Sequence, residues 1–216
     1  MNQLIKKNID MKKNKTTIAV LFILFLLNNV QAQNATLLQK AFTDSYVLEN
    51  KKLYGEAISS LNKVYDENSY EINLRLGWLN YLNKNYAQSQ QFYQKAVAKK
   101  PRSIEAKLGL VNPLATLENQ EKTLQVYNDI LKLDDANYTA NYWSGVIHYN
   151  QKRYEQALRF FEKVVNNYPF NFDGNHLLGW TYLKMNKPNE AKLAFNTALL
   201  IAPGNASCLD ALSKIK

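Results

Sequence analysis

The chain has 216 residues, of which 46% are hydrophobic and 21% charged, and its formal net charge is +9. These values are ordinary for a globular protein, and the length allows one domain or two. Only seven glycines and five prolines are present, which argues against a fold of many short strands and turns and favours helices.

Residues 1–32 predict a secretory signal peptide. Five lysines between Lys6 and Lys15 precede an apolar run from Ile18 to Leu27, and the triplet Val30-Gln31-Ala32 ends in a small residue suited to cleavage. The run is 10 residues long, whereas a helix that spans a membrane needs about 20. Cleavage would leave Gln33 as the first residue, and translation from Met11 would preserve the signal. An uncleaved signal anchor is the alternative, which the shortness of the run disfavours.

This first segment also determines what we expect of charge, anchoring and location. It holds five lysines and one aspartate, so the rest of the chain has a net charge of +5, without a basic run, and nucleic-acid binding is disfavoured. No cysteine directly follows the apolar run, so we expect no lipid anchor and no stable membrane span after cleavage. Cys208 is the sole cysteine, which excludes an intrachain disulfide. The abundance of Lys, Asn, Ile and Tyr suggests an AT-rich bacterial genome, and we expect export to a Gram-negative periplasm, or secretion.

The remaining sequence repeats at one fixed interval, the distance along the chain from Gly77 to Val111. Each position of the repeat keeps its chemical type: glycine or valine, then a small residue, an aromatic ring, a small or branched residue, and proline or aspartate. The series are Gly77, Val111, Gly145 and Gly179; Ser89, Thr123, Ala157 and Ala191; Tyr93, Tyr127, Phe161 and Phe195; Ala96, Ile130, Val164 and Ala198; and Pro101, Asp135, Pro169 and Pro203. Small, aromatic and small residues at i, i+4 and i+7 share one helical face, so each copy predicts two helices.

These residues resemble the tetratricopeptide repeat family. The best match runs from Leu178-Gly179 through Ala191, Phe195 and Ala198 to Pro203, and the resemblance covers residues 38–205. The third copy is degenerate, and Pro113 in its first helix predicts either a bend or tolerated drift. The family's usual tryptophan early in the first helix is absent from every copy. Its place is taken by Asn73, Lys107, Asn141 and Asn175.

The resemblance implies an all-α fold, a right-handed α-solenoid of stacked antiparallel helical hairpins. We expect one solenoid domain over residues 33–216, with repeats at about 38–69, 70–103, 104–137, 138–171 and 172–205 and a capping helix at 206–216. In the capping helix, Leu209 and Leu212 are expected to face inward while Asp210 and Lys214 face water.

In such a solenoid the first helix of each pair lines the concave side, and its glycine faces the partner helix. The opposite stripe lies three residues before the glycine, one after it and four after it. We call this stripe the groove. Its members are Phe42, Tyr46 and Glu49; Leu74, Trp78 and Tyr81; Leu108, Asn112 and Ala115; Tyr142, Val146 and Tyr149; and His176, Trp180 and Leu183. Glu71, Glu105, Asp173 and Lys184 flank it and predict a mainly acidic edge.

An aromatic groove favours a binding scaffold, because Tyr and Trp combine few rotatable bonds with a polar tip. We hypothesise that the groove binds a protein or peptide segment within a cell-envelope complex. A basic or neutral segment suits the acidic edge better than a C-terminal carboxylate does. The alternatives are that the rings only pack adjacent first helices, that the groove binds glycans or cell-wall fragments, or that the repeats self-associate into a structural assembly.

Motifs for catalysis and for phosphate or metal binding are absent from the sequence. It contains no HExxH, paired-cysteine, GxSxG, GxGxxG or phosphate-loop motif, so we predict no enzyme and no cofactor. His148 and His176 belong to neighbouring first helices, without suitable further ligands beside them, so no metal site is predicted.

Overall fold

The computed structural model describes residues 34–215, and the predicted signal peptide lies outside them. These residues form helices and turns without any strand, in two compact units whose boundary falls between Glu67 and Asn68. The first unit contains a helix over residues 34–50 and α2 (Tyr54–Asn62). Its buried residues are Ala41, Ser45, Ala57 and Leu61.

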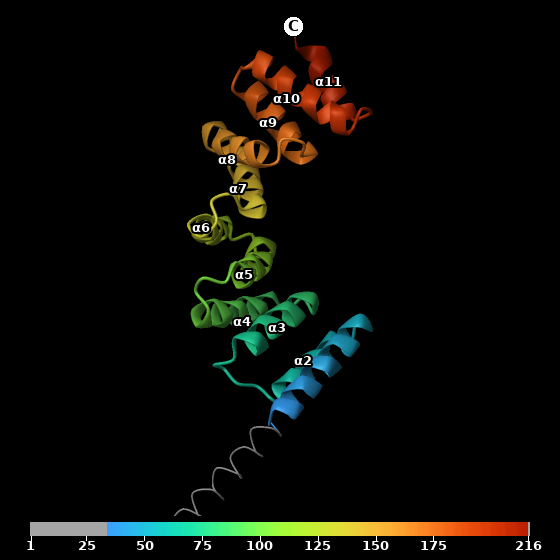
Figure 1. The fold of residues 1–216 in the computed structure, drawn as a ribbon, viewed down its shortest axis with the longest axis vertical. Helices are drawn as coiled ribbons and strands as arrows, with labels where there is room; N and C mark the ends of the chain where they lie inside the picture. The colour runs from blue at the N-terminus through green and yellow to red at the C-terminus, as the bar shows by residue number, and fades with distance from the viewer. Residues whose placement is uncertain (1–33, 216) are drawn as a thin grey trace, which may run out of the picture. The chain divides into compact units, whose positions relative to one another are not determined.

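The second unit contains four helical hairpins followed by one further helix (Figure 1). Each helix packs against the next one in the chain, and α3 also contacts α5, as α7 contacts α9. The helices are α3 (Tyr70–Leu82), α4 (Tyr86–Lys99), α5 (Ile104–Thr116), α6 (Gln120–Leu131), α7 (Tyr138–Asn150), α8 (Tyr154–Asn167), α9 (Phe172–Lys184), α10 (Pro188–Ile201) and α11 (Ala206–Lys214). The expected all-α solenoid of stacked hairpins is confirmed. α5 continues through the buried Pro113 to Thr116.

A serine or asparagine side chain caps the start of each first helix in the second unit, and that of α11. Each accepts a hydrogen bond from the backbone N–H three residues later, which satisfies a donor that the helix itself leaves free. These caps recur at the interval of the repeat, at Ser69, Ser103, Asn137, Asn171 and Asn205. The capping residues at the helix starts therefore follow the repeat interval, as the core residues do.

The turns inside the hairpins are equally regular. Each turn has one residue with a positive φ angle between 55° and 62°, and these residues are Lys52, Lys84, Glu118, Lys152 and Asn186. A left-handed residue after the last helical turn ends the first helix and lets the chain reverse into the second. In the second unit these positions also recur at the interval of the repeat.

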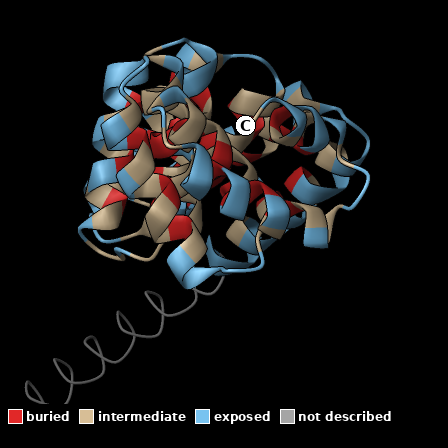
Figure 2. Cartoon of the chain, turned by 90° about the horizontal axis from the view of Figure 1, so that it is seen from above, coloured by how far each residue is buried: buried red, intermediate tan, exposed pale blue. Residues whose placement is uncertain are grey.

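In three of the four hairpins of the second unit, the core is an aromatic ring set against a glycine. Phe161 and Phe195 are fully buried, and a Cβ atom on Gly145 would lie 2.6 Å from Cε1 of Phe161. A Cβ on Gly179 would similarly lie 2.8 Å from Cδ1 of Phe195. The glycine thus allows the two helices of a hairpin to approach with a ring between them. Figure 2 shows the buried residues on the sides where helices meet and the exposed residues on their outer sides.

Buried asparagines occupy the place where the family usually has tryptophan. The Asn175 side-chain amide donates to the carbonyl of Asn171 at 2.8 Å and to that of Pro169 at 2.9 Å. Asn141 donates in the same way to the carbonyls of Asn137 and Asp135, both at 2.9 Å. The amide therefore ties the start of a first helix to the loop that precedes it.

Replacing Asn175 by alanine is expected to lower the free energy of unfolding by about 1–3 kcal/mol, because two backbone carbonyls lose their buried donor. Urea unfolding followed by circular dichroism measures this loss. Asn196, exposed on α10, is the matched control, and its replacement by alanine should change the free energy by less than about 0.5 kcal/mol. Equal effects of the two substitutions would show that the Asn175 amide does not hold the loop.

The capping helix presents a different face from the predicted one. Leu209 is 49% exposed, so its predicted inward position is wrong, whereas Leu212 does pack partly against the cluster of Ala191, Phe195 and Ala198. The side chains buried against this cluster are Cys208 and Ala211. Small side chains let α11 approach the small-residue face of α10 more closely than leucines would.

Candidate functional site

The predicted groove residues of the second unit lie on its first helices, mostly half-buried. Asn112 and Ala115 are on α5, with Ala115 exposed. The half-buried members on the other first helices are Leu74, Trp78 and Tyr81 on α3, Leu108 on α5, Tyr142, Val146 and Tyr149 on α7, and His176, Trp180 and Leu183 on α9. In the first unit, Phe42 and Glu49 are half-buried and Tyr46 is 51% exposed.

Many groove side chains also pack against the next first helix. Leu74 and Trp78 lie against a cluster that contains Leu110 and Leu114 of α5. Tyr142, Val146 and Tyr149 lie against a cluster that contains Leu178 of α9. Part of each ring is therefore used in joining neighbouring hairpins, and the part that stays exposed is what a partner could contact.

The C-terminal end of the groove is joined to the capping helix α11 by hydrogen bonds. The indole N–H of Trp180 lies 3.0 Å from Nε2 of His176 and 3.2 Å from Oγ of Ser207, and His176 Nε2 is 2.9 Å from the same hydroxyl. The Trp180 ring also meets Phe195 edge to face, with 5.5 Å between ring centroids. Trp180 and His176 thus connect α9 to α11.

Burial lowers the pKa of His176 from its ordinary value, although the Asp173 carboxylate opposes the shift. The folded chain therefore binds a proton at this site less readily than the unfolded chain does. Its contribution to stability is fully present above a pH of about 6.5 and is lost as the pH falls through the lower pKa of the folded state.

We therefore expect the free energy of unfolding to fall between pH 8 and pH 5, and to fall less in His176→Gln, whose side chain can still accept from Trp180. Urea unfolding at several pH values measures both slopes. Burial and Arg153 lower the pKa of His148 as well, so the difference between the two proteins isolates His176. If the free energy of unfolding depended on pH identically in the unchanged chain and in His176→Gln, His176 would not be the group responsible.

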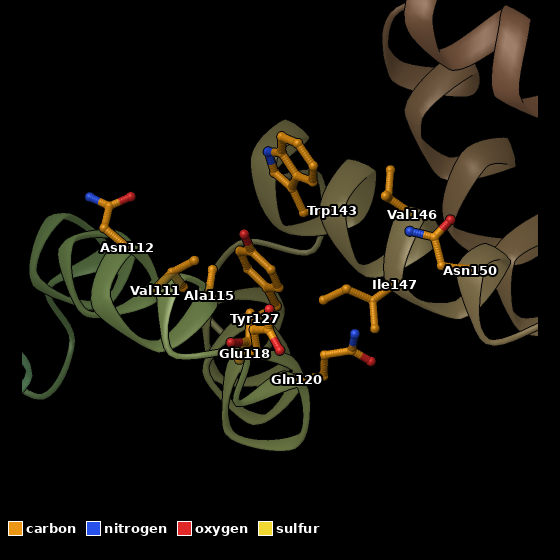
Figure 3. A pocket seen from close by; sticks show the side chains of 11 residues that line it. Val111, Asn112, Ala115, Glu118, Gln120, Tyr127, Trp143, Val146, Ile147 and Asn150 are labelled. Carbon is orange, nitrogen blue, oxygen red and sulfur yellow. The ribbon is translucent and has the colours of Figure 1, made fainter. Parts of the chain in front are cut away.

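A pocket opens beside the groove where the third and fourth repeats meet. Its volume is about 660 Å³, and its lining comes from α5, α6 and α7 (Figure 3). Val111, Asn112 and Ala115 line it from α5; Glu118, Gln120, Thr123 and Tyr127 from the turn and α6; and Trp143, Val146, Ile147 and Asn150 from α7. Asn112, Ala115 and Val146 belong to the groove, so the pocket is a deepening of its surface.

Two aromatic side chains give the pocket polar groups beside an apolar lining. Trp143 is 48% exposed, and Tyr127 is buried except where the pocket reaches it. Burial raises the pKa of Tyr127 to about 12, so its phenol stays protonated and can donate. Within the described residues, neither the phenol nor the Trp143 indole N–H makes a hydrogen bond. Sequence reasoning missed both residues because neither lies on the predicted stripe.

The predicted acidic edge is partly neutralised within the chain. Glu71 pairs with Lys100 at 2.9 Å, and Glu105 accepts a hydrogen bond from the Tyr70 hydroxyl at 3.1 Å. The Lys100 ammonium lowers the pKa of Glu71. Asp173 and Lys184 are on α9. The carboxylate nearest the pocket is that of Glu118, which the predicted edge did not include.

Two further searches of residues 34–215 bear on function. No group of three or more His, Cys, Asp or Glu side chains lies close enough to hold a metal ion. None of the helices in this range combines the length and the apolar character needed to cross a bilayer.

Comparison with known proteins agrees with the repeat seen in the structure. Two tetratricopeptide repeat models match residues 151–215 and 124–172. No curated protein sequence matches the chain. Among solved structures, the MamA protein is 19% identical with a TM-score of 0.70, over 78% of this chain and 93% of that one.

Two other solved structures are similar to the same extent. YrrB, described as a TPR protein with an unusual peptide-binding site, is 18% identical with a TM-score of 0.67, over 80% of this chain and 90% of that one. A tetratricopeptide repeat protein from Parabacteroides merdae is 16% identical with a TM-score of 0.72, over 83% and 72%. At these identities the likeness shows the fold, and the two matching models show tetratricopeptide repeats over residues 124–215.

Proposed function

We propose that this chain is a non-catalytic scaffold that binds a segment of another protein in the groove of its first helices, within a complex of the cell envelope. The pocket between α5 and α7 is the observation that carries the proposal. A repeat protein folds by packing each hairpin on the next, and we call the interface between two successive hairpins a joint. Where a joint is open, as beside the exposed Trp143, its surface is not used by the fold and is available to a ligand.

Location in the envelope rests on the predicted signal peptide. Export would deliver residues 33–216 to the periplasm or beyond it. Mass spectrometry of the chain recovered from the periplasm of its host tests this step. A mature N-terminus at Gln33 supports export with cleavage, and a chain that stays in the cytoplasm with residues 1–32 intact contradicts it.

The binding proposal is tested by capture of partners from an envelope extract. Asn112→Arg with Ala115→Arg places two long cations on the groove face of α5, at positions that no core cluster uses. Leu193→Arg with Leu200→Arg is the matched control, because these leucines are 70% and 73% exposed on α10. The groove variant should lose the proteins that the unchanged chain captures, and the control should keep them. The same proteins on all three chains would overturn the proposal.

Glycan binding is a second candidate, and the exposed Trp143 ring favours it. Asn112 and Asn150 present amide groups to the same pocket, and an aromatic face beside amides can stack on a sugar ring. Titration with peptidoglycan fragments, followed by isothermal titration calorimetry, separates the two functions. Binding of fragments in the absence of any protein, lost in Trp143→Ala, would favour the glycan function.

A further inference from the structure

The joint between the third and fourth repeats lacks a leucine that the other joints contain. Leu110 of α5 packs with the ring of Tyr93, and Leu178 of α9 packs with that of Phe161, so each leucine joins a first helix to the preceding hairpin. The residue at this position of α7 is Ser144. Its side chain is fully buried, and its Oγ makes no hydrogen bond within the described residues.

The joint that has serine in place of leucine is also more open than its neighbours. The first helices α5 and α7 contact each other less than α3 contacts α5 or α7 contacts α9, and the contact between α6 and α7 is less extensive than at the joints on either side. The pocket of about 660 Å³ lies at this joint, and its volume falls within the range of roughly 300–1,000 Å³ that is usual for small-ligand sites. The fourth repeat thus leaves room for an apolar side chain that it does not itself provide.

A single charge lies at the edge of this pocket, and the turn does not explain its sign. Glu118 is the one charged residue in the lining, is exposed, and makes no ion pair within residues 34–215. It adopts a φ of 55° in the turn between α5 and α6. The same place in the turns before and after holds Lys84 and Lys152, with φ angles of 62° and 61°. Since the turn accepts lysine equally well, the carboxylate here is free to serve recognition.

We propose that this pocket holds one large apolar side chain of a bound peptide, and that a lysine or arginine next to it in the peptide pairs with Glu118. The apolar side chain packs against Val111 and Ile147, which line the pocket. The Tyr127 phenol is a donor for a peptide carbonyl. The inference rests on the proposed function and adds to it the pair of peptide residues that the groove recognises.

Glu118→Lys tests the charge without disturbing the fold, because lysine already occupies this turn position in the neighbouring repeats. The probe is an array of decapeptides in a glycine–serine frame that carry every pair of residues at the centre. The unchanged chain should prefer a large apolar residue next to lysine or arginine, by at least about tenfold over the same residue next to glutamate, a difference expected of one charge pair near a pocket. Glu118→Lys should reverse this preference.

Glu121→Lys is the control, since Glu121 is exposed at the start of α6, three residues away and outside the pocket. It should leave the preference unchanged. The proposal is overturned if Glu118→Lys and Glu121→Lys select the same pairs, or if no peptide binds the unchanged chain at about 1 mM, the weak end of specific affinities.

A second pair of variants tests the pocket without changing charge. Ala115→Phe places a ring into the pocket from its exposed wall on α5, whereas Thr116→Phe places the same ring on the adjacent exposed position, which does not line it. For a decapeptide with a central Phe-Lys pair, fluorescence anisotropy should show at least about tenfold weaker binding to Ala115→Phe only. Equal affinities of the peptide for both variants would overturn the proposal that the pocket binds its side chain. The proposed function would still stand if partner capture depended on the groove.

Discussion

Replacement of Phe161 by alanine is expected to lower the free energy of unfolding by about 3–5 kcal/mol, the usual cost of removing a buried aromatic ring. Phe161 is completely buried, where it covers Gly145, meets Tyr142 edge to face at 6.3 Å and packs with Leu178 of the next hairpin. One ring therefore connects both helices of its own hairpin and the first helix of the following one. Its loss leaves a cavity at the point where two repeats join.

Urea unfolding followed by circular dichroism and by tryptophan fluorescence measures this effect. Phe170→Ala is the control, because Phe170 is 69% exposed in the loop after α8 and should contribute less than about 0.5 kcal/mol. Both signals should show the loss in Phe161→Ala, since Trp143 and Trp180 lie on the helices that the ring connects. A loss of less than about 1 kcal/mol would mean that the hairpins do not depend on the ring for their stacking.

Gly145→Val is expected to destabilise the chain by at least about 2 kcal/mol, although valine is the better helix former. The new Cβ alone would lie 2.6 Å from the Phe161 ring, and the γ-methyl groups would need still more room. α7 and α8 must then separate or the ring must leave its rotamer. The third repeat has Val111 at the same place, and the pocket lies directly beside that residue.

Two further variants separate crowding from helix propensity. Gly55→Ala lies in α2, where an added Cβ meets nothing within 4 Å, and should stabilise the chain by about 0.5–1 kcal/mol. Adding Phe161→Leu to Gly145→Val should restore part of the lost stability, because the smaller side chain makes room for valine, and the coupling energy of the double-mutant cycle measures this. Additive losses would show that the glycine and the ring do not face each other.

The repeat and its core could be predicted from the sequence because they depend on residue size at fixed spacing. Gly145 and Phe161 keep their types from copy to copy, and a glycine opposite a ring has one efficient packing. The helix caps at Asn137 and Asn171 follow the same interval, but a polar residue in an asparagine-rich chain gives no contrast with its surroundings. Hydrophobicity alone predicts that Leu209 faces inward, whereas the closeness of α10 selects the smaller Cys208 and Ala211.

The candidate site could be predicted only in part. The stripe that includes Trp78, Tyr142 and Trp180 follows from the helical period, but the period does not distinguish a ring that packs on the next helix from one that stays free. The pocket lies at the joint where Ser144 replaces the leucine of the neighbouring repeats, and Trp143, on the same helix as Ser144, lines it. The repeat interval identifies Ser144 as the counterpart of Leu110 and Leu178, but it does not predict the separation of α5 and α7.

Site-specific photo-cross-linking in the living host tests most directly the claim that the chain works through the face of its first helices around the open joint. A benzophenone amino acid is placed at Ala115, in the pocket wall, or at Leu193, 70% exposed on the second helix α10. A defined partner protein should be captured from position 115 and not from position 193. Capture from position 193 alone would contradict this account.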